Sequence, residues 1–176
     1  MNPKAPAGPG RALVSALIVG TDHKYQRRQD RSEDNERIRD QFEAFLREVI
    51  TQRNVDAIAE EAGNDQEVWE YLKAEEANTP DELKGLFDGM EVVDAPPRTI
   101  ARIMADASNL PYTDIRAPEA DKMSIADRDE AMAKAIAGRF GSKESVLVIV
   151  GEAHRQEVAR ILHERYGWTT ESTSFL

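Results

Sequence analysis

Two stretches of the sequence decide the fold: ALVSALIVGTDH at residues 12–23 and VLVIVGEAH at residues 146–154. Each is an almost uninterrupted apolar run, which is typical of a strand that a parallel sheet buries on both faces. Each run ends in the pattern Gly-x-x-His, and glycine allows the chain to turn sharply after a strand. We therefore expect the two motifs at the ends of two interior strands.

The rest of the chain alternates between helical and strand patterns. Apolar residues recur at three- and four-residue spacing where helices are expected, namely around residues 38–50, 68–72, 79–87, 100–104, 127–139 and 153–166. Strands are expected at residues 12–20, 54–60, 90–93 and 145–151, with a final edge strand at 168–175. This alternation predicts an α/β fold in which helices cover both faces of a mostly parallel sheet, with the strands at 12–20, 54–60 and 145–151 in its interior.

The length of 176 residues favours one domain, because two would each have little surface to bury. Residues 1–10 contain three prolines among small residues and are predicted to form a flexible N-terminal segment. Residues 11–176 then form a single α/β domain. Periodicity fails between residues 108 and 126, and we interpret this irregular loop as a candidate lid, since long loops in compact domains are usually functional.

Composition narrows the choice of partners. The net charge of −10 would repel a phosphate backbone, so we expect no nucleic-acid partner. The chain has no cysteine, and any metal must therefore be held by His, Asp or Glu. No apolar run is long enough to span a membrane, and the expected location is the cytoplasm. A small-molecule or peptide substrate fits these features, and a homo-oligomer is compatible with them.

The candidate site is the edge of the sheet at which the strands end. Ligands of open α/β sheets gather at the carboxyl ends of the strands. His23 and His154 follow two such ends, and Glu60 and Glu61 follow a third. Such a set can activate water as a general base. It can also bind a divalent metal such as Zn, Mn or Co, with His23, His154 and Glu60 as the candidate ligands.

The same residues have simpler interpretations. His163 lies within the last predicted helix, where a solvated position is favoured, and Glu60 and Glu61 could merely begin a polar loop or cap a helix. Asp22 and Glu152 could accept hydrogen bonds at the turns.

Arg128 is a cation near a predicted helix start, which is unfavourable for the helix dipole. It could bind a substrate oxyanion, or it could be neutralised by its acidic neighbours, Asp127 and Asp129. The basic segment at residues 24–28 either faces an anionic substrate or is simply a loop.

The motifs together resemble the TraB/TIKI superfamily, which includes TIKI proteases, TraB pheromone-shutdown proteins, erythromycin esterases and ChaN-type haem-binding lipoproteins. The resemblance rests on the two Gly-x-x-His motifs, an acidic residue after the second strand, and a helix start of the form Arg-Asp/Asn-x-x-Met-Ala. These are matched by Gly20 to His23, Gly151 to His154, Glu60 or Glu61, and residues 128–133. This chain is shorter than most members and lacks their long helical insertions.

The resemblance implies a hydrolase-like site that is metal-dependent in the TIKI branch and metal-free in the esterase branch. It also implies that His and Glu activate water while Arg128 contacts the substrate. We therefore expect a small hydrolase of a peptide, ester or related bond that uses His23, His154, Glu60 or Glu61, and Arg128. The alternative is a non-catalytic module that binds a small ligand, a metal or a protein on the same fold, as ChaN-type members bind a ligand without hydrolysing it.

Overall fold

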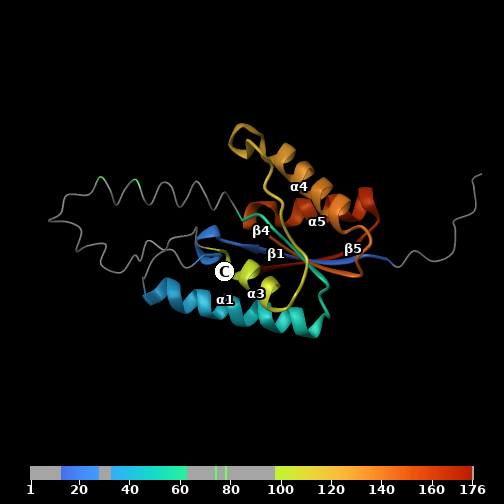
Figure 1. Cartoon of the computed structure of the whole chain (residues 1–176). Coiled ribbons are helices and arrows are strands. Elements are labelled where there is room, and N and C mark those ends of the chain that lie inside the picture. The colour runs from blue at the N-terminus through green and yellow to red at the C-terminus, as the bar shows by residue number, and fades with distance from the viewer. Residues whose placement is uncertain (1–12, 28–32, 63–73, 75–77, 79–97, 176) are drawn as a thin grey trace, which may run out of the picture.

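The computed structural model describes residues 13–27, 33–62, 74, 78 and 98–175 (Figure 1). The N-terminal segment, the expected strand at 90–93 and the expected helices around 68–72 and 79–87 lie outside the described residues. The described part forms an α/β fold around one five-stranded parallel sheet, which confirms the predicted fold class.

The strand order of the sheet is β3-β2-β4-β1-β5. Its three interior strands are β1 (Ser15–Thr21), β2 (Ala57–Glu60) and β4 (Ser145–Gly151). They correspond to the three strands predicted to be parallel and interior, and that prediction is confirmed. The edge strand predicted at the C-terminus is β5 (Thr169–Phe175).

The other edge corrects one prediction. Strand β3 (Tyr112–Asp114) lies within residues 108–126, which the sequence indicated to be an irregular loop. Without it, the backbone N–H and C=O groups along one side of β2 would lack partners. The N–H of Ile58 donates to the carbonyl of Pro111, and the N–H of Ile115 donates to the carbonyl of Glu60. At least part of the predicted lid is therefore a fixed edge of the sheet.

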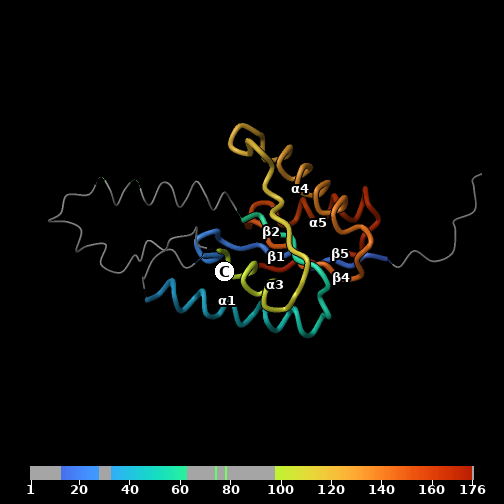
Figure 2. The backbone as a smooth tube through the Cα atoms, in the orientation of Figure 1, coloured from blue at the N-terminus to red at the C-terminus, as the bar shows by residue number. Residues whose placement is uncertain are grey.

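Two layers of helices cover the sheet (Figures 1 and 2). Alternate strand residues such as Ile18 and Val148 pack against α4 (Ile125–Phe140) and α5 (Arg155–Tyr166). Their neighbours along the strands pack against α1 (Glu33–Gln52) and α3 (Ile100–Ala107). The apolar runs are continuous because the strands are buried on both faces. None of the described helices has the length and apolar character that crossing a membrane requires.

The helix ends follow local capping chemistry. Helix α4 begins two residues earlier than predicted, because the Ser124 side chain accepts a hydrogen bond from the N–H of Asp127 and caps the helix there. Helix α5 ends at Gly167, whose φ of 72° is in the left-handed region that favours glycine.

The strand order brings the two motifs together. Strand β4 enters the sheet between β1 and β2, although it comes last of the three along the chain. It pairs with β1 over seven residues, from Ser15 opposite Ser145 to Thr21 opposite Gly151. Both Gly-x-x-His motifs therefore leave the sheet side by side at its carboxyl edge.

Candidate functional site

A short 3-10 turn follows each of the two central strands. The turn η1 (His23–Tyr25) begins at the first motif histidine, whereas η4 (Glu152–His154) ends at the second. The His23 side chain is 50% exposed, and that of His154 is only 8% exposed. One imidazole is accessible to a molecule from solution, and the other lies in the protein interior.

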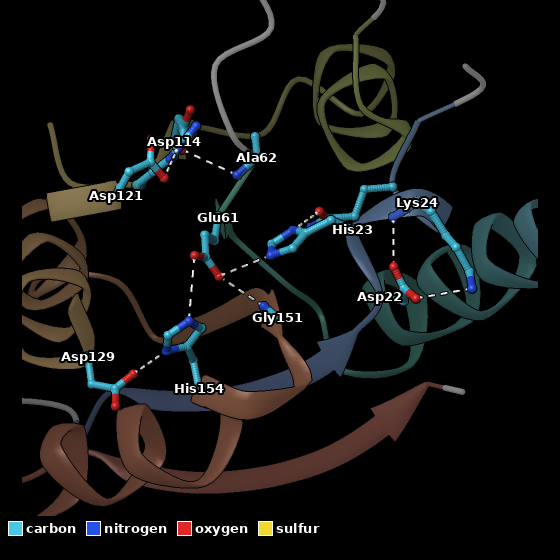
Figure 3. A network of polar contacts seen from close by, with 12 residues as sticks. Asp22, His23, Lys24, Glu61, Ala62, Asp114, Asp121, Asp129, Gly151 and His154 are labelled. Carbon is cyan, nitrogen blue, oxygen red and sulfur yellow. Dashed lines mark hydrogen bonds and ion pairs between the residues drawn. The ribbon is translucent and has the colours of Figure 1, made fainter. Parts of the chain in front are cut away.

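Glu61 lies between the two imidazoles, directly after the last residue of β2 (Figure 3). Its Oε2 is 3.7 Å from Nε2 of His23, and its Oε1 is 3.8 Å from Nε2 of His154. Oε2 also accepts a hydrogen bond of 3.0 Å from the N–H of Gly151. The buried carboxylate of Glu61 thus joins both motifs, and this third strand end completes the site.

The far side of each ring is held by a hydrogen bond. Nδ1 of His23 is 2.7 Å from Oε1 of Gln26, and Nδ1 of His154 is 2.6 Å from Oδ1 of Asp129. An ionised carboxylate only accepts hydrogen bonds, so Nδ1 of His154 carries a proton and donates a hydrogen bond to Asp129. In the neutral ring the unprotonated Nε2 then faces Glu61. Burial raises the pKa of Asp129 above its usual value, although the hydrogen bond from His154 lowers it.

The sequence interpretation missed the contact between Asp129 and His154. It treated Asp129 as an acidic neighbour of Arg128 and as part of the helix-start motif, but a signal for this contact was present. Asp129 belongs to the buried stripe of α4, together with Met132, Ala133 and Ile136. A charged residue on an apolar stripe needs a polar partner inside the protein, and a nearby histidine can provide it.

The motif glycines create space rather than a special backbone turn. A Cβ atom on Gly151 would lie 2.9 Å from Nε2 of His23, and a Cβ atom on Gly20 would overlap the carboxylate of Glu152. Gly151 has φ −56°, which any residue can adopt. The glycine of each motif thus makes room for a side chain of the other motif, and the two motifs interlock.

Glu60, predicted as a catalytic residue and metal ligand, does not join this group. It is completely buried, and its Oε2 accepts hydrogen bonds from the hydroxyls of Thr99 (2.5 Å) and Tyr112 (2.7 Å). Successive strand residues point to opposite faces, and Glu60 follows Ile58 onto the face covered by α3. Complete burial raises the pKa of Glu60 to about 7, against the lowering effect of those hydrogen bonds.

Arg128 lies in the first turn of α4 and is half-buried. Its Nε is buried without a hydrogen-bond partner among the described residues. Neither acidic neighbour neutralises it through an ion pair in the described part of the chain, since Asp127 bonds to Ser124 and Asp129 to His154. No contact described in the structure joins Arg128 to either motif histidine.

The segment after His23 is mostly structural. Lys24 pairs with Asp22, whose side chain also accepts from the N–H of Lys24 and caps η1. Arg27 is buried, and its guanidinium donates to the carbonyl of Ala62, the residue after Glu61. Arg27 therefore connects the turn that carries His23 to the chain that carries Glu61.

Glu152 and His163, the other two polar residues considered in the sequence, both form contacts within the protein. Glu152 bonds to Arg155 and to the hydroxyl of Ser174. His163 is exposed on α5, as its solvated interpretation predicted, and its Nδ1 lies 2.9 Å from the carbonyl of Trp168.

A metal centre needs at least three converging ligands, and that requirement can be compared with the side chains present. The described residues contain no group of three His, Cys, Asp or Glu side chains placed to hold a metal ion. The predicted ligand set included Glu60, which points away from both histidines. The three predicted ligands therefore do not form a metal site in the part of the chain that the structure describes.

Comparisons with known proteins give no further identification: no protein-family model, curated protein or solved structure matches the chain. The TraB/TIKI resemblance accordingly stays a prediction from the sequence motifs.

Proposed function

We propose that the chain is a small hydrolase in which Glu61 and His23 activate water to attack a peptide, ester or related bond. One observation carries the proposal, namely the placement of the Glu61 carboxylate between two imidazole Nε2 atoms, at 3.7 and 3.8 Å. The resemblance of the motifs to the TraB/TIKI superfamily supports the same class of reaction.

The distances favour a water molecule between these groups. An N–H···O hydrogen bond is normally 2.7–3.2 Å long, so 3.7 and 3.8 Å are too long for direct bonds. When the protons of both rings lie on Nδ1, each Nε2 presents a lone pair to a negatively charged carboxylate. Two acceptors that face each other repel unless a proton donor lies between them. A water molecule can donate to Glu61 and to Nε2 of His23, and that arrangement prepares its oxygen for attack.

The proposed reaction begins when a substrate carbonyl approaches from the side of the half-exposed His23. The water oxygen bonds to the carbonyl carbon while one water proton passes to Nε2 of His23. The bond to the leaving group then breaks, and His23 returns the proton to that group. Glu61 holds the water until its oxygen has bonded to the carbonyl carbon, and Asp129 compensates any positive charge on His154.

Arg128 is a proposed contact for the negative charge that develops on the carbonyl oxygen. Its buried Nε has no hydrogen-bond partner in the part of the chain that the structure describes, which is compatible with this role. The proposal does not depend on Arg128, however, because the contacts among Glu61, His23 and His154 carry it.

The second candidate is a binding module that holds a small ligand without turnover. Its support is that Glu61, His154 and Asp129 are buried, so that His23 is the accessible member of the group. A polar ligand could bond to His23 while the buried residues serve only to fix the ring.

The first test is a screen of peptide and ester substrates with the full chain, followed by a matched pair of variants. His23→Ala should lose about 100-fold or more in kcat/KM, because positioned base catalysis contributes about 10²–10⁴. His163→Ala alters an exposed histidine outside the site and should retain activity. Equal loss or equal retention in the two variants would reject the hydrolase assignment. A ligand that binds wild type but not His23→Ala, without turnover, would support the binding module.

A further inference from the structure

Gln26 is a buried residue that belongs neither to the two Gly-x-x-His motifs nor to the family resemblance. Its side chain is completely buried, which is unusual for a glutamine. Gln26 follows His23 by three residues, directly after η1. Side chains three residues apart in a 3-10 turn lie one above the other, and this places the Gln26 amide against the His23 ring.

The main chain of this turn is fixed from three directions. The N–H of Gln26 donates to the carbonyl of His23, and the carbonyl of Gln26 accepts from the N–H of Ile100 at the start of α3. Arg39, a fully buried residue of α1, donates from Nε (3.1 Å) and Nη2 (2.9 Å) to the carbonyl of Lys24. The backbone that carries Gln26 is thus fixed, and the buried Gln26 side chain lies against the His23 ring.

We propose that Gln26 is a positioning residue that fixes the tautomer of His23 and thereby presents an unprotonated Nε2 to Glu61. The contact is between Oε1 of Gln26 and Nδ1 of His23, at 2.7 Å. An amide oxygen only accepts, so the proton of the neutral ring lies on Nδ1. Nε2 keeps its lone pair and can take a proton from water.

The two histidines are therefore held by partners of different charge. Asp129 can compensate a positive charge on His154, whereas the neutral amide of Gln26 orients His23 without adding a charge beside it. This difference suits His23 to act as the base in the proposed hydrolysis. The importance of the His23 tautomer rests on that proposed function.

A Gln26 side-chain amide turned the other way would place the His23 proton on the other ring nitrogen. If the amide were reversed, its nitrogen would donate to Nδ1, and Nε2 of His23 would carry a proton directed at Glu61. His23 would then be a donor to the carboxylate and could not accept a proton from water. Gln26 Nε2 is buried and has no hydrogen-bond partner among the described residues, so the reversed amide would make one bond as well. The location of the His23 proton distinguishes the two arrangements.

The experiment is long-range nitrogen–proton NMR on the ¹⁵N-histidine-labelled full chain, at a pH where the imidazoles are neutral. In wild type, His23 should be protonated on Nδ1. Gln26→Met removes the acceptor at similar side-chain length, and the proton should move to Nε2, where Glu61 is the nearest acceptor. Gln26→Glu restores an accepting oxygen and should restore the Nδ1 form. His154 and His163 are internal references and should keep their wild-type signals.

An Nε2-protonated His23 in wild type would overturn the proposal, and so would an unchanged tautomer in Gln26→Met. The wild-type spectrum decides the matter even if a variant fails to fold. Because the spectra need no substrate, the outcome is separate from that of the hydrolase screen. Where hydrolysis is measured, Gln26→Met should lower kcat by about 100-fold or more with little change in KM, since a wrong tautomer can cost up to about 10⁴ in a catalytic histidine. Gln26→Glu should recover much of this loss.

Discussion

Gly151 shows how closely the two motifs depend on each other. The sequence suggested that the motif glycines allow a sharp turn, but the backbone of Gly151 is one that any residue can adopt. What the position requires is space for Nε2 of His23, which would be 2.9 Å from an added Cβ. The far end of a half-exposed side chain can move, so an added methyl group should displace His23 rather than unfold the protein.

The corresponding prediction is that Gly151→Ala folds normally but loses about 100-fold or more in kcat, because His23 no longer faces Glu61 correctly. Gly138→Ala is the matched control, since no atom lies within 4 Å of a Cβ at that helical position. The control should keep wild-type activity and gain about 0.5–1 kcal/mol in unfolding free energy. Kinetics and chemical denaturation of both variants measure these effects, and full activity in Gly151→Ala would refute the interlocking of the motifs.

At the level of single residues, the sequence predicted the histidines and offered Glu61 as one candidate beside them, but it did not predict the residues that bond to Nδ1 of each ring. The motif histidines were recognisable because each follows a conspicuous apolar run. Asp129 comes from a helix 25 residues before His154, and only the packing of α4 against the sheet brings the two together. Gln26 was close enough in sequence, but its effect on His23 depends on a 3-10 turn that periodicity does not predict.

At the level of elements, the end of β2 divides two adjacent glutamates between different environments. Glu61 lies at the carboxyl edge with the histidines, whereas Glu60 is tied to Thr99 at the start of α3. The alternation of side chains along a strand already implied that the two could not point the same way. The sequence could not tell which of them faced the histidines, because that depends on the register of β2 with β4.

Glu60 should make the stability of the fold depend on pH. Its pKa of about 7 is raised from an ordinary value of 4.5, so between these pH values the folded state binds more protons than the unfolded state. The contribution of the Glu60 carboxyl group to the free energy of unfolding is fully present below pH 4.5, and it is lost as the pH rises to about 7. The difference is worth about 3 kcal/mol, at 1.36 kcal/mol per pH unit.

The neutral variant Glu60→Gln should remove this dependence. Its unfolding free energy should rise relative to wild type as pH increases from about 4.5 to about 7, and the relative gain should then level off. Urea denaturation of both proteins at several pH values measures the difference. If the difference in unfolding free energy between the two proteins does not vary with pH, burial does not raise the pKa of Glu60.

At the level of the whole molecule, the sheet order is what creates the site. The sequence predicted parallel interior strands, and the structure confirms them. It did not predict that β4 lies between β1 and β2, because the position of a strand in a sheet depends on long-range crossovers. That position brings residues more than 90 apart in sequence, such as His23 and Gly151, into contact.

The assembled site also makes a prediction about metals. In the proposed reaction Glu61 and His23 activate the water without a metal, so the hydrolysis that we propose should survive dialysis of the protein against a chelator. Elemental analysis before and after dialysis, together with activity measurements, tests this outcome. Loss of activity that Zn²⁺, Mn²⁺ or Co²⁺ restores in wild type, but not in His154→Ala, would instead establish a metal held partly by His154.

The most direct test compares hydrolysis of one substrate by wild type, Glu61→Gln and Glu60→Gln. The two variants make the same chemical change at adjacent positions, and both glutamates are buried. Glu61→Gln should lower kcat by about 10²–10⁴, because an amide cannot hold and polarise the water as a carboxylate does. Glu60→Gln should stay close to the wild-type rate. A Glu61→Gln protein that retains the wild-type rate, or a Glu60→Gln protein that loses as much, would contradict the central role of Glu61 between the two histidines.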